Sequence, residues 1–355
     1  MVAYIAQVPL HILFAIHVLQ VDGITDCDLY YISTSKNAKS LVEKAKETGM
    51  FRNVILLPNI SLEYPITIKQ IVDISKRRFA VNRIFKGEKY DTVYYNSDGW
   101  LLNSIIFSSI KCKSKNIFVE NGLNPYITSY ESKQWYLRLF INLSLMRCMD
   151  GRFINERYIF EPSLMQVAQK GIIIPLAKLD RKDNELLKKV NEIFDYDQKL
   201  DSFEKFDIII LEQGPRKEPI DMFGLWKRAS ECIPMGRAIV KSHPRQKEGA
   251  LTELGYEVYD RYVIPWEVIS LNQDMGDKTI ISIFSTACVY PKILYGDEPR
   301  VILLYKLLGM DYSFFGSGMI GFVEGVKALY EDKDKFFIPE TWDEFDKYCK
   351  DAFSR

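Results

Sequence analysis

The chain opens with MVAYIAQVPLHILFAIHVL (residues 1–19), a mostly apolar run that is interrupted by Gln7, Pro9, His11 and His17. These interruptions, and the lack of a basic segment before the apolar run, argue against a secretory signal or a membrane anchor. The pattern instead predicts a buried strand at residues 2–6 followed by a helix. The start of the chain is therefore expected to form one strand–helix unit.

The alternation continues through the first half of the chain. Short apolar runs bounded by turn residues predict buried strands. The segment 35–48, rich in Lys, Glu and Ala, predicts a helix that ends at Gly49. Strands that alternate with helices indicate a parallel sheet covered on both faces. The strands predicted in this half are residues 2–6, 29–33, 54–57, 92–95 and 116–119.

A second series of strands follows a change in composition. Helices are expected at residues 131–150 and 154–170, and residues 179–205 are dense in Asp, Lys and Glu, as in a surface helix and a linker. The second series starts with FDIIIL (206–211) and continues at 237–242, 256–258, 279–284 and 300–304. We therefore expect an α/β fold with one Rossmann-like domain at residues 1–200 and a second at residues 201–340. A last helix within residues 341–355 is expected to pack back on the first domain.

The composition limits the class of protein. A chain of 355 residues fits two domains, and 47% hydrophobic with 26% charged residues is typical of a globular protein. Lys plus Arg equals Asp plus Glu at 47 each, which argues against a nucleic-acid binder. The six cysteines form no CxxC pair and there are three histidines, so sequence neighbours cannot build a zinc site. Scattered cysteines favour reduced thiols, and we expect a cytoplasmic protein.

Polar residues at the predicted strand ends carry the chemistry, because ligands of open α/β sheets bind beyond the carboxyl ends of the strands. In VENGLNPY (119–126), Glu120 follows a strand directly and is a candidate catalytic carboxylate, while Gly122 allows a sharp turn. An Asn-Gly turn with a solvated acid is the alternative.

In the second half, VKSHPR (240–245) places His243 between Lys241 and Arg245, whose positive charges would favour the binding of a phosphate. Imidazole, with a pKa of about 6.5, can protonate a leaving phosphate at neutral pH; a surface turn is the alternative. In IFSTAC (283–288), Ser285 and Thr286 either cap a helix or hold a phosphate. Together with the glycine loop LEQGPR (211–216), these features indicate group transfer from a phosphate-linked donor.

Three of these motifs resemble those of a known group. In their order along the chain, Glu120-Asn121-Gly122, His243-Pro244 and Ser285-Thr286 are similar to the acidic-Gly, His-Pro and serine-rich motifs of bacterial sialyltransferases. Within that group, the chain most resembles the capsular polysialyltransferases and the lipooligosaccharide sialyltransferases of glycosyltransferase family 52. YIAQVPLH (4–11) and IPWE (264–267) are similar to the family's first strand and loop and to its Pro-x-Glu segment, so the resemblance spans most of the chain.

The resemblance implies a GT-B fold, in which two Rossmann-like domains face a cleft. It makes residues 1–200 the acceptor-side domain and residues 201–340 the CMP-sugar-binding domain. It also implies an inverting, metal-independent transfer of sialic acid from CMP-sialic acid to a hydroxyl of a cell-surface glycan of the capsule or lipooligosaccharide, with no cofactor. By resemblance, Glu120 is the general base and His243 protonates or stabilises the leaving phosphate. The other implied roles are phosphate binding by Ser285 and Thr286 with Gln213 and Gly214 nearby, the cytosine pocket at Lys241 and Pro244, ribose binding by Glu267, support from Asn121 and Gly122, and an acceptor-side loop at His11.

One position departs from the family pattern, which usually has a second acid where this chain has Asn121. If the first acid is the base, Glu120 suffices; if the second acid is needed, either Glu120 compensates for it or activity is lost. Stabilisation of the loop is an alternative role for Asn121. The alternatives are therefore a transferase for another CMP-activated or nucleotide-activated sugar, and a non-catalytic polysaccharide-assembly protein with a degenerate site. Asp195-Tyr196-Asp197 has the spacing of a metal-binding Asp-x-Asp motif but falls in the charged linker.

The expected partners are a CMP-sugar donor and a glycan acceptor, without nucleic acid. The basic stretch 69–89 has interleaved Phe79, Ile84 and Phe85, and it is either a solvated helix face or a contact with anionic glycan or with lipid at the inner face of the membrane. An oligomer is left open.

Overall fold

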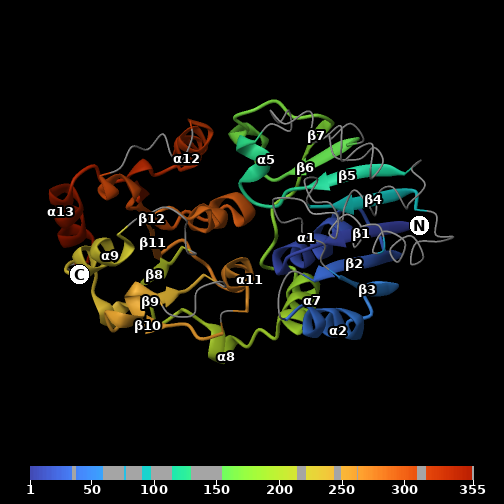
Figure 1. The fold of residues 1–355 in the computed structure, drawn as a ribbon, viewed down its shortest axis with the longest axis horizontal. Helices are drawn as coiled ribbons and strands as arrows, with labels where there is room; N and C mark the ends of the chain where they lie inside the picture. The colour runs from blue at the N-terminus through green and yellow to red at the C-terminus, as the bar shows by residue number, and fades with distance from the viewer. Residues whose placement is uncertain are drawn as a thin grey trace. The chain divides into compact units, whose positions relative to one another are not determined.

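The computed structural model describes residues 1–33, 37–58, 76, 90–96, 114–128, 154–213, 221–243, 249–261, 263–309 and 317–353. The chain separates into two compact units, Met1–Ala177 and Lys178–Arg355. Each unit is built on one parallel sheet (Figure 1). The predicted α/β class with two Rossmann-like units is confirmed.

The sheet of the first unit has seven parallel strands in the order β3-β2-β1-β4-β5-β6-β7. The five strands predicted in this half are all present, and β6 and β7 extend the sheet beyond them. β1 lies inside the sheet, where Val2 pairs with Cys27 on one side and Thr92 on the other. The strands are β1 (Val2–Ala6), β2 (Cys27–Ser33), β3 (Asn53–Pro58), β4 (Thr92–Tyr95), β5 (Lys115–Val119), β6 (Glu156–Ile159) and β7 (Ile172–Pro175).

The apolar opening of the chain is core. Helix α1 (Pro9–Val21) begins with a proline in its first turn, and its residues 11–19 are all buried. Among the described residues, no helix combines the length and apolar character needed to cross a bilayer. The other helices of this unit are α2 (Ala38–Glu47), α5 (Asn124–Ile127) and the 3-10 turn η1 (Pro162–Leu164).

The helix predicted at residues 154–170 is wrong. Glu156–Ile159 forms β6, which pairs with β5, and Pro162 then begins the short turn η1. A strand forms here because the buried edge of β5 needs a partner for its backbone N–H and C=O groups. The helix predicted at 131–150 lies outside the described residues, as does the basic stretch 69–89 except for Lys76.

The sheet of the second unit has six parallel strands in the order β10-β9-β8-β11-β12-β13. The five strands predicted in this half are present, although each is shorter than expected, and β13 was not predicted. They are β8 (Ile208–Leu211), β9 (Ala238–Lys241), β10 (Glu257–Val258), β11 (Thr279–Ser282), β12 (Arg300–Leu303) and β13 (Phe336–Phe337). The helices are α7 (Asn184–Phe194), α8 (Gln198–Asp201), α9 (Met222–Ser230), α10 (Ala250–Glu253), α11 (Trp266–Leu271), α12 (Ser317–Leu329) and α13 (Trp342–Phe353). Shorter helical turns are η2 (Met235–Arg237), η3 (Thr286–Val289), the π-helix η4 (Pro291–Tyr295), η5 (Tyr305–Leu308) and η7 (Lys333–Lys335).

The charged segment before β8 belongs to the second unit. Helix α7 packs on α11, and the Asn191 side chain exchanges hydrogen bonds of 2.8 Å with Asn272. Because these contacts tie α7 to the second sheet, the units divide between Ala177 and Lys178, earlier than the expected boundary at residue 200.

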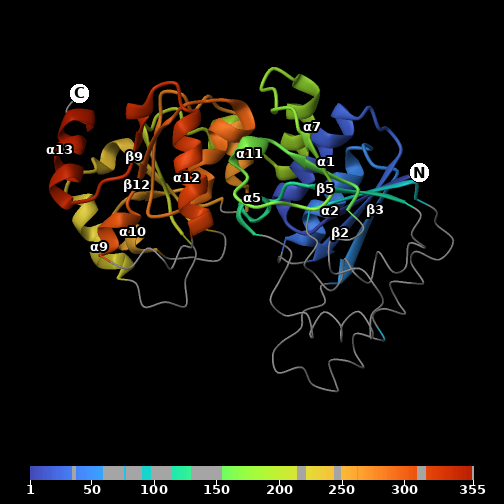
Figure 2. The ribbon, with the colours of Figure 1, turned by 90° about the horizontal axis from the view of Figure 1, so that it is seen from above.

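The last helix also packs within the second unit. α13 lies beside α9 in both views of the ribbon (Figures 1 and 2), and Arg228 of α9 forms an ion pair with Asp346. Arg300 donates to the Tyr348 hydroxyl at 3.0 Å, and the Tyr348 ring stacks on Phe337 at 4.0 Å between centroids. These contacts hold α13 on the second sheet, and the expected packing of this helix on the first domain stays a prediction.

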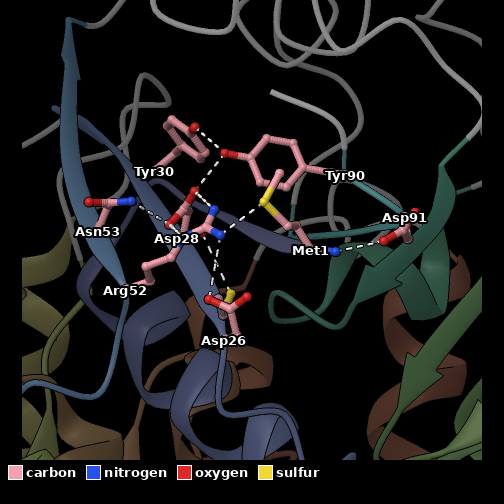
Figure 3. A network of polar contacts seen from close by, with 9 residues as sticks. Met1, Asp26, Asp28, Tyr30, Arg52, Asn53, Tyr90 and Asp91 are labelled. Carbon is pink, nitrogen blue, oxygen red and sulfur yellow. Dashed lines mark hydrogen bonds and ion pairs between the residues drawn. The ribbon is translucent and has the colours of Figure 1, made fainter. Parts of the chain in front are cut away.

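A buried polar network closes the amino-terminal edge of the first sheet (Figure 3). The Asp28 carboxylate, 2% exposed, accepts hydrogen bonds from Arg52 Nε at 2.8 Å, Asn53 Nδ2 at 2.9 Å and the Tyr90 hydroxyl at 2.7 Å. Burial acts to raise the pKa of Asp28, but the hydrogen bonds from Arg52, Tyr90 and Asn53 outweigh it and lower the pKa. The network joins β2, β3 and the segment before β4, and it leaves the carboxyl edge of the sheet for ligands.

Candidate functional site

Four predicted residues of the first unit lie at the carboxyl edge of its sheet. Glu120 directly follows β5, with Asn121 and Gly122 after it, and His11 lies in the first turn of α1 after β1. β1, β4 and β5 are neighbours in the sheet, so the residues that follow them share one edge.

Glu120 is fully buried, so the alternative of a solvated acid is wrong. Its Oε2 accepts hydrogen bonds from the Tyr126 hydroxyl at 2.6 Å and from the Phe160 amide at 2.9 Å. Within the described part of the chain, its Oε1 is buried and has no hydrogen-bond partner. Burial raises the pKa of Glu120 to about 7, although the bonds from Tyr126 and Phe160 oppose the shift. A carboxyl with such a pKa exchanges a proton readily at neutral pH.

The backbone around Glu120 is fixed. Gly122 has a φ of +104°, which an L side chain rarely adopts, as the predicted sharp turn requires. The Asn96 amide donates to the carbonyls of Val119 at 3.3 Å and Glu120 at 3.1 Å. Asn96 was not predicted, although its place directly after strand 92–95 was a usable signal. Asn121 Oδ1 is also buried without a partner among the described residues.

His11 has a structural role at this edge. Its Nδ1 accepts a hydrogen bond from the Gln7 amide at 3.1 Å, which closes the turn between β1 and α1 and leaves the ring proton on Nε2. Burial lowers the pKa of His11 to about 3, so the ring is neutral at physiological pH.

In the second unit, the predicted residues follow three neighbouring strands, β8, β9 and β11. Gln213, after β8, donates from Nε2 to the Phe284 carbonyl after β11. Ser285 Oγ accepts a hydrogen bond from the Ala287 amide at 3.3 Å, so it caps η3, as one of the two interpretations expected. Thr286 and His243 are partly exposed at the same edge, and Gly214 and Pro244 lie outside the described residues.

Lys241 and Glu267 form the charged part of this edge. Lys241 is 5% exposed, and its Nζ lies 5.2 Å from the centroid of the Tyr259 ring. Burial lowers the pKa of Lys241 to about 8, while the charges of Glu267 and Asp201 oppose the shift. Burial also raises the pKa of Glu267, which a backbone hydrogen bond and Lys241 oppose. The charge of each group therefore shifts the pKa of the other.

The segments that carry Glu267 and Ser285 are also joined. The Trp266 indole Nε1 donates to the Ala287 carbonyl at 2.9 Å, which places the start of α11 beside η3. The second unit thus gathers a cation, a carboxyl and hydroxyls at one edge, a set suited to a nucleotide with its phosphate.

The similarity of this chain to known proteins lies in its fold and not in its sequence. No protein-family model matches the sequence, and no curated protein is similar to it in sequence. The crystal structure of the glycotransferase of kitacinnamycin is 11% identical with a TM-score of 0.52, covering 99% of this chain and 90% of that chain. The fold is GT-B. UGT89C1 of Arabidopsis thaliana complexed with UDP (10% identity, TM-score 0.49, 99% and 94% covered) and MurG of Acinetobacter baumannii (12%, 0.45, 100% and 90%) are more distant in structure.

Two further residues of the GT-B second unit were missed by sequence reasoning. Glu212, 5% exposed, accepts hydrogen bonds from Ser242 Oγ at 2.8 Å and from the Leu251 amide at 3.4 Å. It joins the loop after β8 to the loop after β9, which carries His243. A Cβ at Gly249 would lie 2.3 Å from both Glu212 carboxylate oxygens, so a larger residue there would displace the Glu212 carboxylate. The signal was an acid directly after the strand FDIIIL.

The Asp-x-Asp pattern serves helix ends. Asp195 is the left-handed C-cap of α7, with a φ of 59°, and Asp197 accepts a hydrogen bond from the Lys199 amide at 2.8 Å as the N-cap of α8. In the described ranges, no group of three or more His, Cys, Asp or Glu side chains is placed to hold a metal ion.

Proposed function

We propose that this protein is a glycosyltransferase that moves a sugar from a nucleotide-activated donor to an acceptor hydroxyl. The observation that carries the proposal is Glu120, a buried carboxyl at a strand end of a GT-B fold. Its pKa of about 7, and its Oε1 without a hydrogen-bond partner among the described residues, suit a general base. A group held only for stability would have both oxygens hydrogen-bonded.

The chemistry is a single displacement. Glu120 removes the proton of the acceptor hydroxyl, and the acceptor oxygen bonds to the anomeric carbon of the donor sugar. The bond from that carbon to the phosphate oxygen breaks, and its electron pair stays on the phosphate. His243 protonates or stabilises the departing phosphate. Attack from the face opposite the leaving group inverts the anomeric configuration, as in inverting glycosidases.

For the donor we propose CMP-sialic acid, on the order of the Glu120, His243 and Ser285 motifs along the chain. CMP leaves with a single phosphate, whose charge His243, Lys241 and the Ser285 and Thr286 hydroxyls can meet without a metal ion. Glu267, whose raised pKa is opposed by the charge of Lys241, is the proposed ribose ligand.

The proposed acceptor is a glycan of the capsule or lipooligosaccharide, and the proposed location is the cytoplasm at the inner face of the membrane. Flotation with anionic liposomes tests the location. Binding should fall when Arg77, Arg78 and Arg83 are reversed in charge, and unchanged binding removes the peripheral contact from the proposal.

The first experiment compares binding of CMP, UMP, UDP and GDP by calorimetry and then measures nucleotide release from CMP-sialic acid with a panel of glycan acceptors, with and without EDTA. Tight binding of CMP and release that persists in EDTA support the donor. Preference for another nucleotide moves the proposal to the corresponding sugar donor. Binding of a nucleotide without release from any donor supports the non-catalytic assembly protein, and absence of all nucleotide binding overturns the proposed function.

The second experiment assigns the roles. Glu120→Gln and His243→Ala should each reduce release at least a hundredfold, in keeping with the usual contribution of an acid or base. Glu43→Gln, the same change on the exposed face of α2, should leave release unchanged. Full activity in Glu120→Gln would show that another group removes the proton.

A further inference from the structure

The two oxygens of the Glu120 carboxyl have opposite surroundings. Oε2 accepts two hydrogen bonds, one from the Tyr126 hydroxyl at 2.6 Å and one from the Phe160 amide at 2.9 Å. Oε1 is buried and, among the described residues, accepts none. A carboxylate has acceptor sites on both oxygens, so a buried one is ordinarily satisfied on both. The asymmetry therefore distinguishes one oxygen as the proton-exchanging atom.

Tyr126 is held so that its hydroxyl points one way. The side chain is fully buried in α5, and its carbonyl accepts a hydrogen bond from the Gln166 amide at 2.8 Å. Its hydroxyl oxygen accepts a hydrogen bond from the Glu161 amide at 3.3 Å, which leaves the hydroxyl proton for Glu120. The Glu120 amide is itself bonded to the Tyr158 carbonyl at 3.0 Å. Both partners are thus fixed to β6 and the residues that follow it.

The charges around Glu120 agree with this arrangement. Burial raises its pKa, the Tyr126 and Phe160 hydrogen bonds lower it, and the nearby Glu161 carboxylate raises it further. No cation of the described residues acts on it. When Glu120 takes up a proton, Oε2 is already engaged with two donors, so the proton resides on Oε1.

We infer that Tyr126 is a positioning residue that holds Glu120 with Oε1 directed to the proton of the acceptor hydroxyl. The inference rests on the proposed function for the identity of that proton. In the transfer step, the hydroxyl proton passes to Oε1 and the acceptor oxygen bonds to the anomeric carbon. The bond from that carbon to the phosphate then breaks, and its electrons stay on the phosphate. Tyr126 touches neither reactant and acts through Glu120.

The test is the pH profile of Tyr126→Phe. Loss of one hydrogen bond to the ionised carboxylate should raise the pKa of Glu120 and move the acid limb of kcat by about one pH unit to higher pH. Release measured on the acid limb should fall about tenfold, while the KM for the donor stays unchanged. Tyr90→Phe is the matched control, because it removes a buried hydroxyl that donates to Asp28 at 2.7 Å on the opposite edge of the same sheet. Its profile should equal that of the wild type.

A second measurement does not depend on catalysis. Carbon-13 NMR of labelled glutamate, with Glu120→Gln for assignment, should show the Glu120 carboxyl titrating near pH 7 in the wild type and higher in Tyr126→Phe. If Tyr126→Phe does not fold, the chemical shift of the Tyr126 hydroxyl proton in the wild type should change with pH at the same midpoint as the Glu120 carboxyl. That change should be absent in Glu120→Gln. An unshifted profile and an unshifted Glu120 pKa in folded Tyr126→Phe overturn the inference but leave the proposed function. A shifted Glu120 pKa in a protein that transfers no sugar supports the role of Tyr126 and overturns the proposed function.

Discussion

Glu120→Gln replaces the buried carboxyl by a neutral amide of nearly the same shape, and its effect on stability can be worked out from the pKa. The pKa of Glu120 rises from 4.5 in the unfolded chain to about 7 in the fold, because burial disfavours the charged form. The folded state therefore binds the proton more tightly, and the cost of ionisation is absent below pH 4.5 and complete above pH 7. At about 1.4 kcal/mol per pH unit, the folded protein loses about 3 kcal/mol over that window.

Glutamine carries no such cost. Its carbonyl can accept the bonds from Tyr126 and Phe160, and its amide takes the position of Oε1. We expect Glu120→Gln to be about 3 kcal/mol more stable than the wild type at pH 8 and to lose this advantage at pH 4.5. For a unit of 177 residues, the gain corresponds to roughly 6–12 °C in Tm.

The assay is differential scanning calorimetry of both proteins at pH 5 and pH 8. His11, whose pKa is lowered to about 3, reduces stability as pH falls below 6.5, but it does so equally in both proteins and cancels in the difference. Glu43→Gln, on exposed α2, should show no such difference. If the Glu120→Gln gain does not increase between pH 5 and pH 8, the carboxyl ionises in the fold without cost, and the argument for a base with a raised pKa fails.

Three other changes test the second unit and the amino-terminal edge of the first sheet. Gly249→Ala should cost about 1–3 kcal/mol in urea unfolding and weaken nucleotide binding, because its Cβ would lie 2.3 Å from the Glu212 carboxylate. Gly236→Ala is the control and should have neither effect, because nothing lies within 4 Å of a Cβ at that position. Lys241→Met should weaken nucleotide binding and remove the decline in affinity that calorimetry should find in the wild type above pH 8, where Lys241 loses its charge. Asp28→Asn should cost about 2 kcal/mol in urea unfolding at pH 7, with the loss shrinking as pH falls below about 4, because the lowered pKa of Asp28 stabilises the fold only while the group is ionised.

The sequence was sufficient for most of the sheet framework, because buried parallel strands are short apolar runs between turns. It failed at β6, where ERYI contains Arg157, a charged residue that is 0% exposed. Arg157 is accommodated by its Nε bond to the Lys170 carbonyl at 2.7 Å and by the Phe118 ring, 4.7 Å from its guanidinium carbon. Both partners are distant in sequence, so the local pattern resembled a helix.

The candidate site shows the same division. Glu120, His243 and Ser285 could be chosen because each directly follows a predicted strand, and their roles stay predictions. The environment of Glu120 could not be predicted, since one of its donors, the Phe160 amide, is 40 residues away along the chain. Tyr126 stood only six residues from Glu120, but nothing in its sequence position indicates that its hydroxyl faces the carboxyl.

Asp28 and Glu120 are buried carboxyls at opposite edges of the first sheet, and their ionised forms have opposite effects on the stability of the fold. Asp28 is surrounded by donors from Arg52, Asn53 and Tyr90, and its pKa is lowered, so it contributes to stability in the ionised form. Glu120 is equally buried, but its pKa is raised and one oxygen has no partner among the described residues. Stability alone would favour glutamine at that position. The raised pKa of Glu120 corresponds to a cost of about 3 kcal/mol at pH 8, and the group lies at the sheet edge where α/β proteins bind ligands. Both facts support the proposal that Glu120 acts through the oxygen that has no partner among the described residues.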